Sequence, residues 1–452
     1  ALESVVAELN EEVEAPLAPQ EALAVHIPST PLRHTMETAY EYNPTYKAQQ
    51  RAFQAAVEQV PQALSGALPS VDLGYSKGRQ RTRSAGSGWN SSNSQAKTLT
   101  ASQPLFRGGA TYANTKSARR QVDASMARLI QVEQSMLLQA ITAHMDVVRA
   151  NAVLDLSIKN RDVLAKQKEA ASQRFQVGED TRTDVAQSKA RLALAESEVT
   201  NSKSQLESFK AVYRELVGTE AQSFDIPEDL PEIPQTIERF IELALENSPL
   251  VKEAEALKHS ADYVVDANLG TLLPTLDIQG SMARQEGVGS FGNTDFDQDE
   301  ILLAARMPLY SGGQRYSRVR QAKENYQQRR FQLLETTNQV RRLATSAWED
   351  LSAAASTIVS NDAAVSAAEV ALNGVRQEQQ YGSRTTLDVL DAERELFNAQ
   401  VQLVIAKRNR VVAAYSVLAV LGKLTARDMS LEVPFYNADE YYDDTEYQFI
   451  GF

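Results

Sequence analysis

Two long stretches of this chain contain no proline, and this absence constrains the fold more than any other feature. The stretches run from Leu105 to Ile226 and from Leu309 to Val433. Proline in a helix interior costs about 3 kcal/mol, so two such stretches rich in Ala, Gln, Glu, Lys and Arg predict very long helices. Each stretch begins in the same short phrase, Pro-Leu-Phe-Arg-Gly-Gly at 104–109 and Pro-Leu-Tyr-Ser-Gly-Gly at 308–313.

Further matches indicate that the chain consists of two copies of one unit. Leu-Pro-Ser-Val-Asp-Leu at 68–73 corresponds to Leu-Pro-Thr-Leu-Asp-Ile at 273–278, an offset of 205 residues. Gly178 corresponds to Gly382 at an offset of 204 residues. A repeat of this length predicts a duplicated structural unit, not a short-period solenoid.

The net charge of −13 comes from the two ends of the chain. Residues 1–32 contain six acidic residues and residues 428–452 contain seven, and neither segment contains Lys or Arg. The rest is balanced and has no basic stripe, which argues against a nucleic-acid partner. We expect both acidic tails to be disordered. A start at Ala1 without an apolar leader fits a mature protein after signal-peptide removal, or an engineered start.

The residue types that carry catalysis are missing or scattered. Cysteine is absent, which excludes disulfides and thiolate chemistry. The Gly pairs are not followed by Gly-Lys-Ser/Thr, and no Ser/His/Asp grouping is visible. The four histidines are too far apart to form a paired metal motif: His26, His34, His144 and His259. We therefore predict no cofactor, no metal site and no enzymatic activity.

Each copy predicts a helix, a β-hairpin, a long helix and a shorter return helix. Val71, Leu73 and Tyr75 alternate with polar residues, which is strand spacing, and the Gly/Ser/Asn-rich residues around Trp89 predict a loop. A weaker strand is expected at 95–103, and in the second copy a polar loop at 287–299 and a closing strand at 301–307. The predicted divisions are a leader at 1–33, a first repeat at 34–218 (helix 33–66, hairpin 69–105, helices 108–175 and 184–217), a linker at 219–234, a second repeat at 235–422 (helix 235–270, hairpin 274–308, helices 312–380 and 387–421), and a tail at 423–452.

The long helices carry coiled-coil seams. Their apolar residues recur at spacings of three and four and are often alanine, which allows neighbouring helices to approach closely. At 1.5 Å per residue, about 65 residues form a rod of roughly 100 Å. Such a rod is too long for the wall of a compact domain.

The two hairpins fit either of two environments on their patterns alone. They could be ordinary soluble hairpins, or they could cross a membrane, because strands of about 10 residues suffice when tilted. Four strands cannot close a membrane barrel, which needs about eight. Three copies would supply twelve strands and would also cover the open sheet edges. Since each hairpin immediately precedes a rod in both repeats, the membrane interpretation is favoured.

At this point the chain resembles the TolC family of outer-membrane efflux and secretion channels, over about residues 34–424. The most specific stretch is Tyr-Gly-Ser-Arg-Thr-Thr-Leu-Asp-Val-Leu-Asp-Ala at 381–392, which follows the family's second helix turn. Arg-Phe-Gln-Val-Gly at 174–178 with Thr-Asp-Val at 183–185 follows the first turn. The duplicated unit, the Leu-Pro strand entries and the Gly-Gly helix starts agree in order and spacing.

The resemblance implies a mainly α fold with β-strands, in which a homotrimer shares one twelve-stranded barrel in the outer membrane of a Gram-negative bacterium. The long helices would form a periplasmic tunnel with an equatorial belt at mid-height. The linker at 219–234 and the segment at 423–452 would contribute to that belt, and the acidic tails would be disordered beyond it. The implied function is the passive exit duct of a tripartite efflux pump or a type I protein secretion system, or both. The implied partners are a periplasmic adaptor (membrane fusion) protein, an inner-membrane RND or ABC transporter, and outer-membrane lipid.

The resemblance also implies roles for residues at the two helix turns. Asp388 and Asp391 would form the gate, a ring of carboxylates that attracts cations; from one chain alone they could equally be an ordinary helix N-terminal pair. The closed-state lock would comprise Thr183, Asp184, Gln379 and Arg384, with Gln379 standing where the family has tyrosine. The adaptor-docking tips would be Val177, Gly178, Glu179, Tyr381, Gly382 and Ser383, although glycine by itself also explains the reversals.

A second hypothesis from another class is a soluble periplasmic coiled-coil scaffold or adaptor protein with small capping hairpins. Extraction separates the two hypotheses. A channel should require detergent and migrate as a heat-modifiable trimer, whereas a scaffold should be found in the soluble periplasmic fraction.

Overall fold

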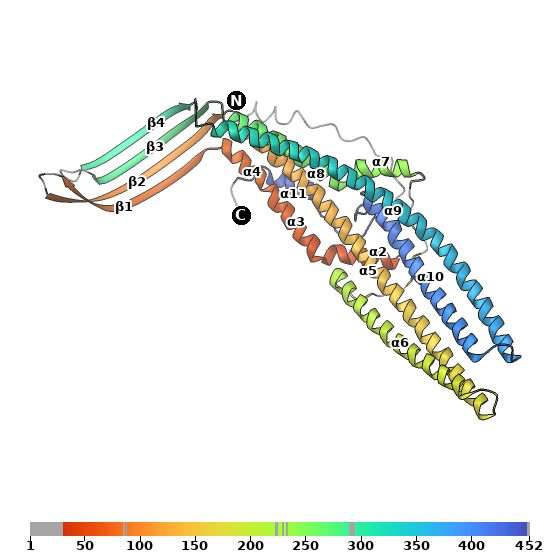
Figure 1. The fold of residues 1–452 in the computed structure, drawn as a ribbon. Helices are drawn as coiled ribbons and strands as arrows, with labels where there is room; N and C mark the ends of the chain where they lie inside the picture. The colour runs from red at the N-terminus through yellow and green to blue at the C-terminus, as the bar shows by residue number, and fades with distance from the viewer. Residues whose placement is uncertain are drawn as a thin grey trace.

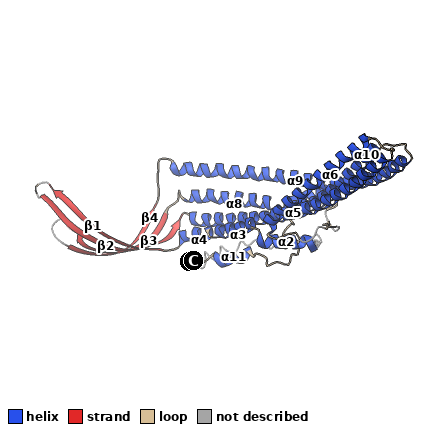
Figure 2. Cartoon of the chain, turned by 90° about the horizontal axis from the view of Figure 1, so that it is seen from below, coloured by secondary structure: helices blue, strands red, loops and turns tan. Residues whose placement is uncertain are grey.

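The structure is a computed structural model, which describes residues 30–84, 86, 88–221, 225–227, 230–231, 234–288 and 294–449. Most of the acidic leader lies outside this range. The molecule is elongated, and a β-sheet projects from one end of a bundle of long helices (Figure 1). Seen from below, the sheet and the bundle follow one another along a single axis (Figure 2).

The two predicted hairpins form one antiparallel sheet. Its strands are β1 (Ser70–Ser84), β2 (Gly88–Arg107), β3 (Thr275–Val288) and β4 (Thr294–Arg306), in the order β1-β2-β3-β4. The hairpins meet where β2 pairs with β3, in a ladder that contains one irregularity between Pro104 and Phe106. Both outer strands, β1 and β4, therefore have one unpaired edge within the protomer.

Two strands are longer than the sequence predicted. β2 begins at Gly88, so the predicted loop around Trp89 is wrong: Trp89 pairs with Arg83 in the ladder. β4 begins at Thr294, inside the predicted polar loop at 287–299. Ser, Asn and Asp have low strand propensity, but cross-strand backbone hydrogen bonds and pairing with a regular partner strand outweigh that preference.

The two proline-free stretches contain the expected long helices. α5 (Ala110–Gln176) and α9 (Gln314–Gln380) each have 67 residues, about 100 Å at 1.5 Å per residue. Each begins directly after a glycine pair. The shorter helices α6 (Arg182–Val217) and α10 (Thr386–Val420) return along α5 and α9 respectively. The predicted helical hairpins are thus present in both repeats.

The first helix of each repeat is broken, contrary to the prediction of single helices at 33–66 and 235–270. The segments are α2 (Thr30–Tyr42), α3 (Pro44–Val57), α4 (Gln59–Leu64) and a short 3-10 helix (Ser65–Ala67), then α7 (Ile237–Asn247) and α8 (Pro249–Gly270). The main break follows from the Xaa-Pro pairs, because the residue before proline avoids the helical region. Asn43 caps α3 by accepting from the N–H groups of Thr45 and Tyr46.

These breaks allow helices from distant parts of the chain to stack end to end. The Asn43 side chain donates to the Leu216 carbonyl (3.1 Å), so α3 begins where α6 ends, and the two lie in line beside α5 (Figure 1). Gly218 follows α6 with φ +85°, and a Cβ there would lie 2.5 Å from the Tyr42 ring. The second repeat joins α8 to α10 similarly, with Gly422 against the Asn247 carbonyl.

The main hydrophobic core lies at these junctions, halfway along the bundle. Its largest fully buried side chains include Tyr46, Phe53, Phe240 and Tyr415. The C-terminal segment packs onto this core and ends in α11 (Ala438–Thr445), which contacts α3. Glu446 forms an ion pair with Arg119 of α5 (2.6 Å). The C-terminal segment therefore packs against the middle of the bundle through residue 449, whereas we expected its acidic part to be disordered beyond an equatorial belt.

None of the described helices combines the length and apolar character needed to cross a membrane.

Candidate gate at the helix turns

The two turns that join the helical hairpins have the same backbone structure. In the first, the Gly178 N–H donates to the Phe175 carbonyl (3.1 Å) and the Glu179 N–H to the Arg174 carbonyl (2.9 Å). Tyr381 to Ser383 repeat this pair of bonds in the second turn. This is a Schellman motif, in which the residue after the C-cap adopts positive φ. Gly178 and Gly382 have φ of +83° and +76°, a conformation that a side chain would strain.

An aspartate then caps each return helix. The Thr181 N–H and hydroxyl donate to the Asp184 carboxylate (3.0 and 2.6 Å), and the Asp184 N–H donates back to the Thr181 hydroxyl (3.3 Å). Thr385 and Asp388 form the same capping box at α10. Hydrogen bonds from Thr181, chiefly through its hydroxyl, lower the pKa of Asp184. Those from Thr385, chiefly through its N–H, lower the pKa of Asp388. Both carboxylates are therefore ionised at neutral pH.

An ion pair closes each turn, and its polarity is reversed between the repeats. Arg174 bonds Asp180 across the first turn (2.9 Å), and Glu378 bonds Arg384 across the second (2.9 Å). At the 204-residue offset, Arg174 matches Glu378 and Asp180 matches Arg384. In one protomer, the predicted lock residue Arg384 therefore has its partner within its own turn.

Asp391, which the sequence predicts in the gate, joins the two hairpins. Its carboxylate accepts from the Arg191 guanidinium of α6 (2.6 Å). Leu390, 1 % exposed, packs beside this ion pair in a small cluster with Leu164 and Ala195. One apolar contact and one ion pair thus hold the end of the second hairpin against the first.

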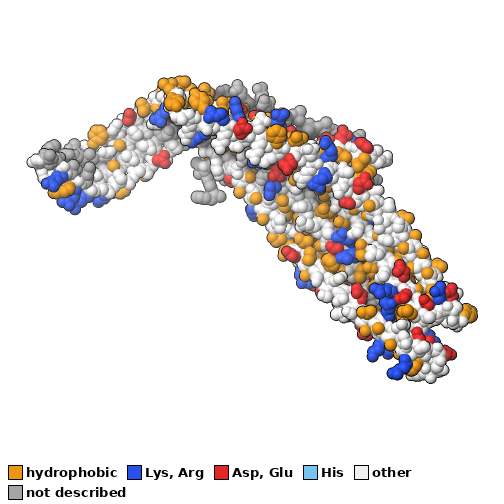
Figure 3. Space-filling model, viewed as in Figure 1, with side chains coloured by type: hydrophobic (Ala, Val, Ile, Leu, Met, Phe, Trp, Pro, Cys, Tyr) orange, Lys and Arg blue, Asp and Glu red, His pale blue; other side chains and the backbone are white. Residues whose placement is uncertain are grey.

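The other predicted turn residues differ in their surroundings. The Gln379 amide donates to the Thr386 hydroxyl (3.1 Å), a hydrogen bond within its own turn. Gln379 stands at the position where the TolC family has tyrosine. Thr183 is exposed on the first turn of α6. The two tips project from the bundle, with Val177 72 % and Tyr381 88 % exposed. Charged side chains of both signs gather near this end of the molecule (Figure 3).

The structure brings together some predicted residues and adds others. The second turn and the start of its return helix contain Gln379, Arg384, Asp388 and Asp391, and the start of the first return helix contains Thr183 and Asp184. Sequence reasoning missed the bonding partners Arg191, Glu378 and the Arg174–Asp180 pair. The two ion pairs that close the turns could have been predicted, because in each the oppositely charged residues are six positions apart on either side of the glycine. No local signal links Arg191 to Asp391, because they are 200 residues apart.

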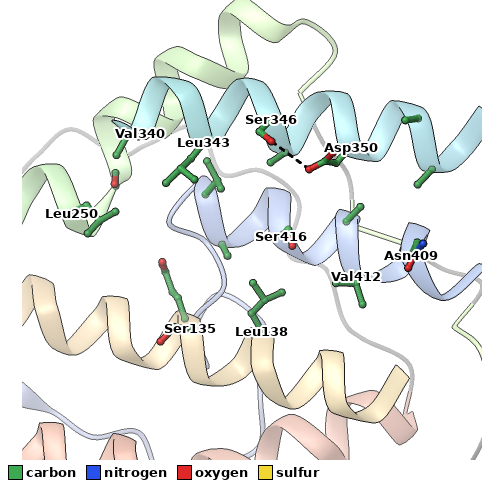
Figure 4. A pocket seen from close by; sticks show the side chains of 18 of the residues that line it. Ser135, Leu138, Leu250, Val340, Leu343, Ser346, Asp350, Asn409, Val412 and Ser416 are labelled. Carbon is green, nitrogen blue, oxygen red and sulfur yellow. Dashed lines mark hydrogen bonds between the residues drawn. The ribbon is translucent and has the colours of Figure 1, made fainter. Parts of the chain in front are cut away.

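A groove of about 720 Å³ lies between α5, α8, α9 and α10 (Figure 4). Its wall is mainly apolar or small, with Leu138, Val340, Leu343 and Val412 facing into it. The Ser346 hydroxyl donates to Asp350 at one side. Among the described residues, no group of three His, Cys, Asp or Glu side chains could hold a metal ion.

Comparison with known proteins identifies the family. The family model for outer membrane efflux proteins matches residues 35–219 and 240–423, which are the two repeats. The outer membrane efflux protein BepC of Brucella suis is 30% identical over 423 residues, covering 94% of this chain and 92% of BepC. The outer membrane protein TolC of Escherichia coli is 24% identical over 408 residues, covering 86% of this chain and 81% of TolC.

Solved structures share the fold. The outer membrane protein VceC of Vibrio cholerae superposes with a TM-score of 0.73 at 22% identity, covering 87% of this chain and 99% of VceC. The channel protein CusC gives a TM-score of 0.78 at 15% identity, covering 91% of this chain and 95% of CusC. The expected resemblance is confirmed. The chain belongs to the outer membrane efflux protein family, and is thus an outer-membrane efflux or secretion channel protein and not an enzyme.

Proposed function

We propose that three copies of this chain enclose one continuous exit duct, which opens and closes at the helix turns. The observation that supports this most directly is the isolated four-stranded sheet with two unpaired edges and one exposed apolar face. Four strands are too few to close a membrane barrel, and unpaired edges favour association with further strands. Three sheets would supply twelve strands and leave no free edge.

The helical hairpins of the three copies would continue the duct into the periplasm. In this arrangement Asp388 and Asp391 of each copy face the axis near its end and form the gate, with six carboxylates in a small space. Charges of one sign at such separations repel one another and attract cations, and more strongly where water is partly excluded. The gate should therefore bind multivalent cations from the periplasmic side.

Opening would separate the hairpins in the manner of an iris. Within each copy the Arg191–Asp391 ion pair and the Leu390 cluster resist that separation. Between copies, the lock residues Thr183, Asp184, Gln379 and Arg384 are placed at the two turns where neighbouring hairpins would meet. Arg384 would have to leave Glu378, or share it, to bond a neighbouring turn.

The exposed tips would dock a periplasmic adaptor that connects the duct to an inner-membrane RND or ABC transporter. Val177 and Tyr381 expose large apolar surface at equivalent positions of the two repeats, beside Glu179 and Ser383. Two similar tips per copy would offer six related sites around the duct. Energy for export would come from these partners.

Conductance in planar bilayers tests the gate. Multivalent cations added on the periplasmic side should block the current through the wild-type channel. Asp388→Asn with Asp391→Asn should abolish the block, and asparagine at 388 retains an oxygen that can cap α10. Glu179→Gln is the matched control, because it removes an exposed tip carboxylate outside the proposed ring. A block that persists in the double variant would remove the case for the gate.

A further inference from the structure

The sheet has one apolar face and one polar face. The apolar band consists of Val71, Leu73 and Tyr75 on β1, Leu99 and Ala101 on β2, Ile278 and Met282 on β3, and Ile301 and Leu303 on β4. Most of these side chains are strongly exposed in the protomer; Leu73 is 81 % and Ile301 86 % exposed. The opposite face carries mainly Ser, Thr, Gly, Asp and Gln. This alternation is that of a membrane barrel with lipid on the apolar side.

Beyond the apolar band, on the same face, the two edge strands carry opposite charges. β1 continues as a basic ladder at every second position: Lys77, Arg79, Arg81 and Arg83. β4 carries an acidic ladder at every second position: Asp295, Asp297 and Asp299. Basic side chains gather at the far end of the sheet along the β1 edge (Figure 3). The first hairpin is therefore positive where the second is negative.

Contacts among the described residues of the protomer do not balance these charges. Asp299 and Asp297 share one guanidinium, that of Arg284 on β3, at 2.9 and 3.7 Å. One cation beside three carboxylates leaves the acidic ladder negative. On β1, Arg79 donates to the Ser91 hydroxyl (2.8 Å), and Arg81 and Arg83 lie over the Trp89 ring at 5.1 and 5.9 Å. These partners are uncharged, so the basic ladder remains positive.

The apolar band also indicates how a neighbouring copy would align. The residues directly opposite one another from β1 to β4 are, in order, Leu73, Leu99, Met282 and Asp299. The band is centred at Leu73 on β1 but between Ile301 and Leu303 on β4, about three residues nearer the helices than Asp299. The centre of the apolar band thus shifts along each successive strand toward the helices. This shift is expected in a barrel, because its strands are tilted and staggered while the membrane has a constant thickness.

In the proposed barrel, the strand next to β4 is β1 of the neighbouring copy. The same drift, about four residues by then, brings Asp299 opposite the region just beyond that copy's Leu73. Only odd-numbered residues of β1 share the apolar face, so Asp299 meets Lys77 or Arg79. Because the strands are antiparallel, Asp297 then meets Arg79 or Arg81. In both registers every acidic residue of the ladder faces a basic one.

We propose that the basic ladder of β1 pairs with the acidic ladder of β4 in a neighbouring copy, and that this charge pairing sets the register of the seam between protomers. The proposal rests on the trimeric duct proposed above. Opposite charges on directly facing residues stabilise a strand pair, and like charges destabilise it. A slip that places the basic ladder against Ile301 and Leu303 would lose these pairs and bury charges in the apolar band.

Disulfide cross-linking tests the register directly, because the chain contains no cysteine of its own. Asp297→Cys combined with Arg79→Cys or with Arg81→Cys should give covalent oligomers on oxidation of the detergent-solubilised protein. Asp297→Cys with Tyr75→Cys is the control, since it reports the register without drift. Cross-linking mainly through Tyr75, or through none of these pairs in a particle of three chains, would overturn the proposal.

Charge reversal tests the pairing itself. Arg79→Glu with Arg81→Glu should lower the fraction of trimer that survives sodium dodecyl sulfate several-fold, and reversing the two facing aspartates should restore it. These are Asp295→Arg with Asp297→Arg if position 297 cross-links to position 79, and Asp297→Arg with Asp299→Arg if it cross-links to position 81. The first complement leaves the Asp299–Arg284 ion pair intact. A loss that the β4 changes do not rescue would contradict the proposal and would indicate that the basic ladder binds lipid phosphates. A wild-type particle that is not trimeric would instead contradict the proposed function.

Discussion

At the scale of single residues, the charged groups of the turns already have partners within one protomer. Asp184 and Asp388 cap helices, Arg384 bonds Glu378, and Asp391 bonds Arg191. A role between protomers must therefore compete with these bonds. This competition can be measured, because either partner of the ion pair that closes a turn can be substituted while the other is kept.

The lock predicts different effects for the two partners of one ion pair. Arg384→Ser removes the guanidinium that would bond a neighbouring turn, so single-channel conductance should rise. Glu378→Gln breaks the same bond within the turn but leaves Arg384 free to bond elsewhere, so conductance should stay at the wild-type level or fall. Equal increases in planar bilayers would show that only the bond within the turn matters.

Asp184→Ala should also raise conductance if Asp184 belongs to the lock. The variant weakens the cap of α6 as well, so Thr181→Ala is the matched control: it removes the capping hydroxyl and keeps the carboxylate. An increase in Thr181→Ala as large as that in Asp184→Ala would assign the effect to the cap.

Glu133 lies where the C-terminal segment contacts α5, and its burial predicts that the stability of the folded protein depends on pH. Its carboxylate accepts from the Ala426 N–H (2.7 Å) and the Tyr46 hydroxyl (3.3 Å), and burial raises its pKa to about 7. Between pH 4.5 and 7 the unfolded chain loses this proton while the folded chain keeps it. The contribution of Glu133 to stability is thus complete below its ordinary pKa and is lost as pH rises through 7.

Glu133→Gln should therefore increase the free energy of unfolding above pH 7, by about 3 kcal/mol, and raise the unfolding temperature there, while changing both little at about pH 5. Thermal unfolding of the detergent-solubilised protein at both pH values measures this. Glu198→Gln, at an exposed site on α6, should have no such pH dependence. A stabilisation by Glu133→Gln that is equal at both pH values would contradict the assignment.

At the scale of elements, much of the architecture could be predicted because it depends on local rules. Proline absence located α5 and α9, glycine located the turns, and period-two alternation located β1 and β3. The misses have tertiary causes. The polar start of β2 becomes a strand because β1 pairs with it, and the C-terminal segment is ordered by contacts to Glu133 and Arg119.

The candidate site divides in the same way. The turns, their capping threonines and the spacing of Asp388 and Asp391 are local, so the sequence could predict their positions. The Arg191–Asp391 pair is not local, since it depends on how two hairpins from different repeats pack. That packing decides whether Asp391 faces its own protomer or the axis, and it cannot be predicted from the spacing of residues in the sequence.

Two glycines of the second hairpin predict opposite responses to the same substitution. Gly382 has φ +76°, so Gly382→Ala should destabilise the turn by about 1 kcal/mol. Gly374 lies within α9 with open space around it, so Gly374→Ala should stabilise the helix by about 0.5–1 kcal/mol. Denaturant unfolding of the two variants compares them. A change of the same sign in both would contradict the turn geometry described here.

At the scale of the whole molecule, the duplication explains why one protomer is incomplete. Each repeat contributes one hairpin to the sheet and one long helix with its return helix to the bundle, and the two repeats pack side by side. The sheet still has two free edges, and α9 exposes Phe331, Leu334 and Val359 along its length. Apolar surface of this extent on a rod is typical of an interface. Further copies would bury it.

The mass of the particle extracted from the outer membrane tests this account most directly. Light scattering with detergent subtracted, or analytical ultracentrifugation, should find three 49.8 kDa chains per particle, about 149 kDa, and the particle should require detergent to stay dispersed. A single 49.8 kDa chain that remains monodisperse in buffer without detergent would contradict it.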